Sequence, residues 1–160
     1  MGISTPALYG AFTSKADLYR EALELYLAQR SREAWRTLAE EPTARGAVAF
    51  LLRESARAFT DPRYPPGCMY SAAVLACAEE TKPIARLTAG LRQDTMERIQ
   101  ARLQRGVDEG ELPTTTDVGG MARFYGAIIQ GMSVQAQDGA TRQELSRIAE
   151  FALVHFPSSR

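Results

Sequence analysis

Apolar residues recur every three or four positions along almost the whole chain, which is the spacing of amphipathic α-helices. No stretch alternates apolar and polar residues convincingly with the period of two that a half-buried strand shows. The sequence therefore predicts an all-α fold, a bundle of helices. The predicted helices span residues of about 15–40, 43–60, 68–77, 83–110, 116–137 and 141–155.

Capping and helix-terminating residues mark several of these boundaries. Ser14 precedes Asp17 by three positions and Thr141 precedes Glu144 by three, which approximates the capping box of a helix N-terminus. Pro42 ends the first long helix, because the residue before a proline avoids helical geometry. These signals place helix starts after residues 14 and 141 and a helix end before residue 42.

Two glycines, Gly126 and Gly131, lie inside the predicted helix at residues 116–137. Each costs about 1 kcal/mol relative to alanine in a helix interior. Either the helix tolerates this cost, or another helix backbone approaches closely at these positions. The pattern leaves both interpretations open.

The last two predicted helices are apolar on more than one face. A helix of this kind is usually buried on more than one side, and near the end of so short a chain a second copy would provide the cover. We therefore predict a homodimer held by these two helices. The expected interface residues are Met121, Tyr125, Ile128, Met132, Leu145, Ile148 and Ala152.

The stretch at residues 68–77 is built from small residues, which leave room beside a helix. We expect an apolar cavity next to it, because a well-packed core would fill that volume. An apolar pocket with few polar groups suits a hydrophobic or aromatic small molecule, although ordinary core packing is the alternative for each lining residue. The expected lining residues are Phe50, Phe59, Met69, Leu91 and Phe124.

The first residues of the chain read as a short helix, a tight turn and the start of a long helix. Pro6 suits the first turn of the short helix, and Leu8 and Phe12 share one of its faces. This run resembles the recognition helix and following turn of TetR-type (TetR/AcrR) transcriptional regulators. The matching positions are Gly2, Ser4, Leu8, Tyr9, Phe12 and Lys15.

The resemblance implies that this helix lies in the major groove of operator DNA. It then places Tyr9 and Lys15 at the phosphate backbone and Thr5 and Ala7 at base edges, with Ser4 also in the DNA-binding set. Phosphate contacts position such a helix, and base contacts specify the sequence. The alternative for this stretch is a helix hairpin with no partner.

The resemblance also implies a domain organisation and a function. Residues 1–36 would be a partial helix-turn-helix region, with the recognition helix and a linking helix, and residues 37–160 a ligand-binding and dimerisation domain. TetR-type regulators carry two helices before the recognition helix, so we expect this chain to be truncated at its N-terminus. The intact protein would be a repressor that releases operator DNA when a small-molecule effector prefers one of two conformations.

The alternative function is a stand-alone dimeric module that binds a small molecule, or acts as an antagonist, without touching DNA. The formal net charge of zero, from 19 basic and 19 acidic residues, argues against a broad nucleic-acid surface but not against a compact reading helix. No apolar run is long enough for a membrane span and no signal peptide is recognisable, so we expect no membrane partner and a cytoplasmic location.

The sequence offers little support for catalysis or for a cofactor. His155 is the single histidine, and no nucleophile–base pair or glycine-rich phosphate loop is recognisable. Neither Cys68 nor Cys77 has a second ligand at metal-binding spacing, and both read as small buried hydrophobes. We therefore expect no enzyme activity, no cofactor and no metal site.

Overall fold

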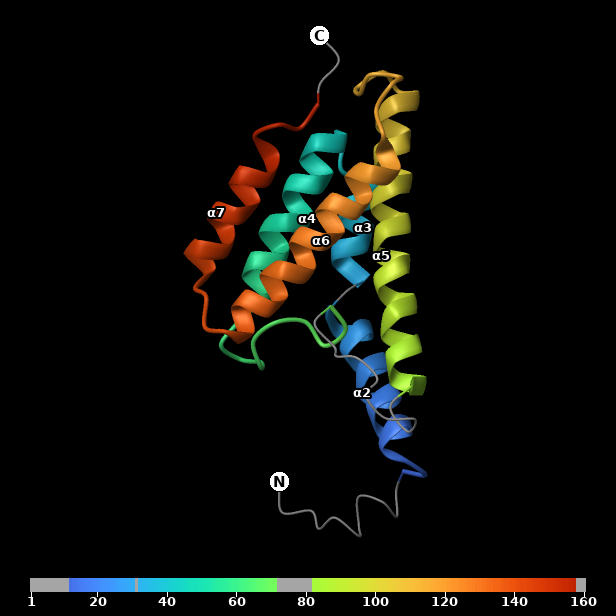
Figure 1. Ribbon diagram of the computed structural model, residues 1–160, viewed down its shortest axis with the longest axis vertical. Helices are drawn as coiled ribbons and strands as arrows, with labels where there is room; N and C mark the ends of the chain where they lie inside the picture. Colours follow the sequence, from blue (N-terminus) through green and yellow to red (C-terminus); the bar gives the residue numbers. More distant parts are fainter. Residues whose placement is uncertain (1–11, 31, 72–81, 158–160) are drawn as a thin grey trace.

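The computed structural model describes residues 12–30, 32–71 and 82–157. These residues form six helices and no strand, so the all-α prediction is confirmed. Figure 1 shows the helices gathered into a bundle, with α5 along its length and α2 at one end. The helices are α2 (Lys15–Arg30), α3 (Arg32–Glu40), α4 (Ala44–Phe59), α5 (Lys82–Asp108), α6 (Val118–Gln137) and α7 (Arg142–Leu153).

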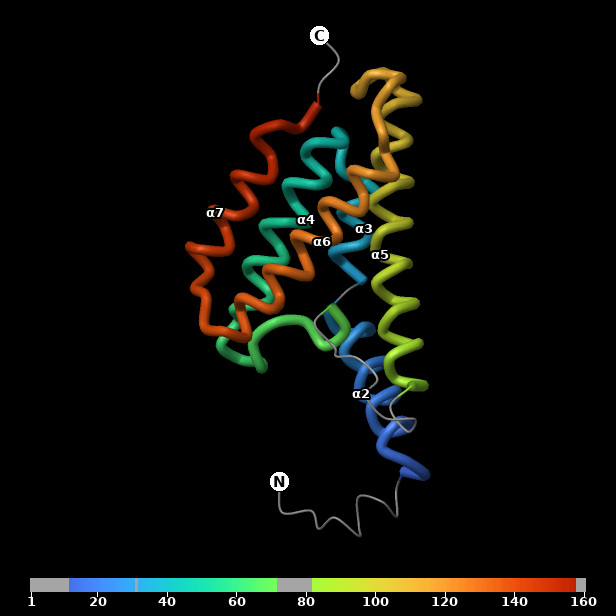
Figure 2. The backbone as a smooth tube through the Cα atoms, viewed as in Figure 1, coloured from blue at the N-terminus to red at the C-terminus, as the bar shows by residue number. Residues whose placement is uncertain are grey.

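Helix α4 is the centre of the bundle. It contacts α3, α5, α6 and α7, and the backbone trace shows α4 and α6 side by side with α7 along the outer face of α4 (Figure 2). Most of its apolar residues are buried, including Val48, Leu52 and Phe59. Burying one such side chain contributes about 1.5–3 kcal/mol, which is why this helix can hold four others together.

Four of the helices begin where a side chain satisfies a free backbone N–H group of the first turn, and at α6 this side chain is Asp117, which accepts from the Gly120 N–H (2.9 Å). Thr43 accepts a hydrogen bond from the Gly46 N–H at the start of α4. Thr141 and Glu144 form the predicted capping box of α7, which confirms that prediction. At α2, the Asp17 N–H donates to Ser14 Oγ (3.1 Å), and the Ser14 hydroxyl donates to the Asp17 carboxylate (2.8 Å).

Two of the predicted helices need correction. Residues 15–40 are two helices, α2 and α3, which pack on different neighbours: α2 contacts α5, whereas α3 contacts both α4 and α5. Periodicity alone does not detect such a change of partner within one amphipathic run. Residues 68–71 form a turn rather than a helix, and the rest of the stretch that carries Cys77 lies outside the described residues.

The two glycines inside α6 differ in their surroundings. A Cβ added at Gly126 would lie 3.0 Å from Met96 Cγ of α5, so a side chain rather than a helix backbone approaches there. A Cβ at Gly131 would meet nothing within 4 Å. Close packing therefore accounts for Gly126, and α6 simply tolerates Gly131.

Candidate functional site

A small pocket of about 70 Å³ lies where α2, α3 and α4 meet the turn at residues 68–71. Four aromatic side chains line it, one from each of these elements: Tyr26, Trp35, Phe59 and Tyr70. Ser55 and Thr95 bring hydroxyl groups to the same wall, and both residues are buried. The pocket therefore offers aromatic faces, a few neutral hydrogen-bonding groups and two charged residues, Arg30 and Glu54.

The tyrosines of the pocket are neutral hydrogen-bonding groups at physiological pH. Burial and, to a smaller extent, the neighbouring Cys68 together raise the pKa of Tyr70 to about 12. The pKa of Tyr26 is also raised, first by burial and then by Cys68. Both phenols therefore keep their protons and can donate or accept hydrogen bonds in the pocket.

The turn beside the pocket is bonded to four different helices through four consecutive residues. The Gly67 N–H donates to Phe59 O of α4 (2.9 Å), and the Cys68 N–H donates to Ser133 Oγ of α6 (2.8 Å). The hydroxyl of Tyr19 in α2 donates to Met69 O (2.5 Å). Arg92 of α5 donates to Tyr70 O (2.8 Å).

This pattern explains why residues 68–71 are not helical, since their backbone groups bond to other elements instead of to one another. Gly67 has a φ of 86°, and a Cβ at that position would lie 2.8 Å from the Ser133 carbonyl oxygen. A glycine is therefore required for the turn to pass so close to α6. Because Tyr19 of α2 is hydrogen-bonded to the turn, a molecule in the pocket that displaced the turn would also act on α2.

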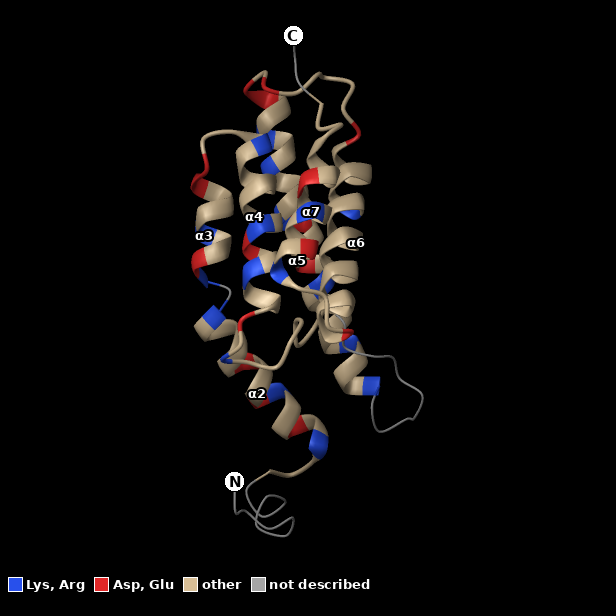
Figure 3. Ribbon diagram, turned by 90° about the vertical axis from the view of Figure 1, so that its left-hand side faces the viewer, with Lys and Arg blue, Asp and Glu red and all other residues tan. Residues whose placement is uncertain are grey.

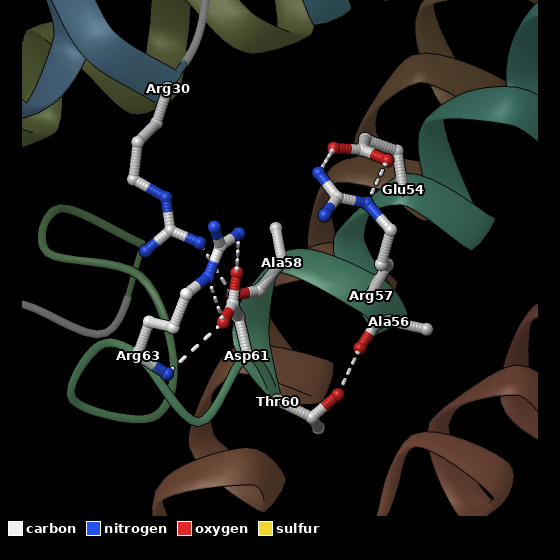
Figure 4. Close-up of polar contacts among 8 residues, drawn as sticks. All are labelled: Arg30, Glu54, Ala56, Arg57, Ala58, Thr60, Asp61 and Arg63. Atoms are coloured by element: carbon white, nitrogen blue, oxygen red, sulfur yellow. Dashed lines mark hydrogen bonds and ion pairs between the residues drawn. The ribbon is translucent and has the colours of Figure 1, made fainter.

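Arg30, at the C-terminal end of α2, makes a second connection between α2 and the pocket wall. Its guanidinium donates to Ala58 O at the end of α4 (2.8 Å; Figure 4). Its Cζ also lies 4.2 Å from the centre of the Tyr64 ring. In the same loop, Arg63 forms a two-pronged contact with Asp61 and lowers the pKa of that carboxyl well below its usual range. Since Arg30 also lines the pocket, α2 supplies part of the wall itself.

The predicted DNA-binding residues fall mostly outside the described part of the chain. Ser4, Thr5, Ala7 and Tyr9 lie outside it. Lys15 is exposed and is the first residue of α2, directly after the Ser14 cap. Figure 3 shows basic and acidic residues interspersed over the helices, which agrees with the balanced charge of the sequence.

Of the five residues expected to line the cavity, the structure places one, Phe59, in the pocket wall. Phe50 lies instead beside a polar groove near Arg30, and Met69 and Leu91 are half-buried away from the pocket lining. Phe124 is 53% exposed, so its expected inward orientation is wrong: it lies on the outer face of α6. The sequence analysis missed Tyr26, Trp35 and Tyr70, because helical periodicity does not distinguish a core position from a pocket wall.

The expected interface residues divide between the interior and the surface. Tyr125, Met132 and Leu145 are already buried within the single chain, although Tyr125 also lines a surface groove between α6 and α7. Met121, Ile128, Ile148 and Ala152 are only partly buried. The most exposed large apolar side chains of this region were not among the expected interface residues, and Phe124 was expected to line the cavity instead. They are Phe124 and Val134 on α6, Phe151 on α7, and Val154 directly after α7.

A groove of about 530 Å³ runs between the start of α6 and the end of α7. Phe124, Phe151 and Ala152 line it, together with Met121 and Tyr125. Tyr125 packs edge-on against Phe124, with ring centroids 5.2 Å apart, and burial raises its pKa to about 12. The two exposed aromatic residues Phe124 and Phe151 thus share one groove on the C-terminal helices, whose lining also includes Thr116, Asp117 and His155.

Within the described ranges, no group of three or more His, Cys, Asp or Glu side chains could hold a metal ion. None of the described helices is long and apolar enough to cross a membrane. Cys68 is buried and carries a free thiol.

Comparison with known proteins decides the family. Residues 44–151 match the family described as "Tetracyclin repressor-like, C-terminal domain". The chain belongs to the TetR family. In keeping with this, it is 32% identical over 158 residues to the HTH-type transcriptional repressor ComR of Escherichia coli K12, covering 98% of this chain and 75% of ComR.

Other relatives and solved structures agree. The chain is 23% identical over 125 residues to the uncharacterised HTH-type transcriptional regulator YezE of Bacillus subtilis 168, covering 78% of this chain and 64% of YezE. A cysteine mutant of the TetR family regulator CifR, solved with 26-base-pair operator DNA, superposes with a TM-score of 0.89 at 37% identity, covering 97% of this chain and 81% of CifR.

A TetR regulator from Rhodococcus sp. RHA1 superposes with a TM-score of 0.71 at 34% identity, covering 98% of this chain and 84% of the other. The family resemblance seen in the first residues is therefore confirmed, and this chain is a TetR-family transcriptional regulator. Its relatives are transcription regulators rather than enzymes.

Proposed function

We propose that this regulator is a repressor that binds operator DNA as a homodimer and releases it when a small molecule occupies the aromatic pocket. The observation that carries the proposal is that α2 forms part of the pocket wall through Tyr26 and Arg30. A helix that contacts the effector directly can respond to it without an intermediate element. Operator DNA is bound by the relative CifR, and we extend that partner to this protein.

The effector we propose is a small hydrophobic or aromatic compound. The pocket has aromatic walls and neutral phenols, and its volume of about 70 Å³ admits only a compact group. The tether from Tyr19 to Met69 O links the same wall to the N-terminal half of α2. A compound that fits one position of this turn better than another shifts the balance between two positions of α2.

We propose that a second copy of the chain covers the apolar surface of α6 and α7. Phe124 is 53% exposed and Phe151 is 75% exposed. Two aromatic side chains that share one groove and face water mark a protein–protein interaction site. The partly buried Met121, Ile128, Ile148 and Ala152 would lie around them. Four helices, two from each copy, would then meet at the interface.

For the domain organisation, we propose a DNA-reading part at residues 1–36 and an effector-binding and dimerisation part at residues 37–160. Residue 37 lies inside α3, and the family match begins at residue 44. Helix α3 would then be shared by the two parts and would connect them rigidly. We place the protein in the cytoplasm as part of the same proposal, because its operator DNA would be there.

The test is fluorescence anisotropy with labelled DNA from the protein's own promoter region, using the chain together with any in-frame coding sequence upstream of Met1. We expect sequence-specific binding that an aromatic compound from a screen weakens at least tenfold, which is about 1.4 kcal/mol. Ser55→Leu, which fills the pocket, should abolish this response but keep DNA binding. Absence of specific DNA binding would instead favour the stand-alone ligand-binding module.

A further inference from the structure

A second cleft, of about 240 Å³, lies between α3 and α5. Its lining is apolar on the α3 side, with Trp35 and Leu38, and basic on the α5 side, with Arg98, Arg102 and Arg105. None of the described residues that line it is acidic. We call the aromatic pocket described above, lined by Tyr26, Phe59 and Tyr70 among others, the effector pocket. The cleft is separate from the effector pocket but shares one lining residue with it, Trp35.

Arg102 is the unusual residue of this cleft, because it is a buried cation with unused donors. It is 4% exposed, and only its Nη2 has partners: Glu41 O (3.1 Å) and Glu111 Oε1 (3.3 Å). Its Nε and Nη1 have no hydrogen-bond partner in the described part of the chain. A buried donor without an acceptor costs roughly 1–3 kcal/mol, and more when the group is charged.

The other two arginines are held by their own partners. Arg98 Nε donates to Asp94 Oδ2 (2.8 Å), which leaves the guanidinium 5.5 Å from the centre of the Trp35 ring. Arg105 donates to the carbonyl oxygens of Ala39 and Glu41 at the end of α3. Arg105 Nε also lacks a hydrogen-bond partner, but it lies 3.6 Å from Glu109 Oε1, in an ion pair. Arg102 therefore differs from its neighbours in having two donors without an acceptor.

We propose that this cleft binds a small carboxylate carried on an aromatic or aliphatic body, independently of the effector pocket. A carboxylate supplies acceptor oxygens to the unused N–H groups of the planar guanidinium, for which it has matching geometry. Its apolar body would lie against Trp35 and Leu38. A bare inorganic anion would leave that apolar half of the cleft uncovered, so we expect it to bind more weakly.

Trp35 makes the proposal easy to test, because it is the only tryptophan of the chain. Its emission reports on the cleft and on the pocket, so variants must separate the two. Benzoate is the probe, benzamide is its neutral isostere, and inorganic phosphate is the anion without an apolar body. We expect saturable quenching or a shift of Trp35 emission by benzoate, and at least tenfold weaker binding of benzamide and of phosphate.

The variants distinguish the cleft from the pocket. Arg102→Lys keeps the charge but loses the planar guanidinium, and Ala101→Phe narrows the cleft with Arg102 still present. Each should raise the half-saturating benzoate concentration about tenfold. Arg53→Met, at an exposed position of α4, should leave it unchanged. Ser55→Leu should also leave it unchanged, because Ser55 lines only the effector pocket.

Three results would overturn the proposal. The first is no saturable response to benzoate by the wild-type chain. The second is loss of the response in Ser55→Leu but not in Ala101→Phe, which would place benzoate in the effector pocket. The third is equal binding of benzoate and benzamide, which would show that the guanidinium is not used.

Discussion

The hydrogen bond between the Cys68 N–H and Ser133 Oγ fixes the pocket wall to α6, and its loss should have a measurable cost. Both groups are buried, and their separation is 2.8 Å. Ser133→Ala leaves the Cys68 N–H without an acceptor, which costs about 1–3 kcal/mol. Alanine is a better helix former than serine by roughly half a kcal/mol. The net loss of stability should therefore be about 0.5–2.5 kcal/mol.

Urea denaturation followed by circular dichroism measures this difference, and the melting temperature should fall by roughly 1–10 °C for a chain of this size. The matched control is Ser146→Ala in α7, whose hydroxyl donates to the Arg142 carbonyl on the surface and can be lost within about 0.5 kcal/mol. Hydrogen exchange should also show faster exchange at residues 67–71 in Ser133→Ala alone. If Ser133→Ala is as stable as the control, the turn is not held by this bond and our account of the pocket wall is wrong.

Three further predictions concern packing, assembly and pH. Gly106→Ala should destabilise the chain by about 1–2 kcal/mol in urea titrations, because its Cβ would lie 2.7 Å from the buried Ala44 Cβ. The control Gly90→Ala, with nothing within 4 Å of its Cβ, should stabilise the chain by up to about 1 kcal/mol. Equal effects of the two substitutions would contradict the close packing of α5 at Gly106. Phe151→Glu should convert a dimer to monomer on sizing chromatography at micromolar concentration, and an unchanged elution volume would count against the interface. Burial raises the pKa of Tyr70 from 10.0 to about 12, so between these pH values the phenol loses its proton in the unfolded chain but keeps it in the folded one. The free energy of unfolding should therefore be constant just below pH 10 and fall between pH 10 and 12. Constant stability up to pH 12 would refute this prediction.

The sequence by itself determined most of the helices of this protein. Helical periodicity predicted α4, α5, α6 and α7 close to their observed bounds, since each buries one stripe against the bundle. The capping box of Thr141 and Glu144 was predictable because both partners lie within one turn. The family was also readable in the first residues, where a motif of fixed spacing is carried by the side chains themselves.

Tertiary structure decided which residues share a site. Tyr26, Trp35 and Tyr70 come from three segments, and their periodicity is that of ordinary core residues, so only packing brings them around one pocket. The non-helical turn at residues 68–71 depends on partners from α2, α5 and α6, which are distant in sequence.

The same holds for the surface of α6 and α7. Both helices are apolar on more than one side, and the sequence alone did not tell which side faces α4 and α5. The structure assigns Tyr125 and Met132 to the interior and Phe124 to the outside. Periodicity fixes the angle between side chains around a helix axis, whereas the rotation of the helix about that axis is set by the neighbours against which it packs.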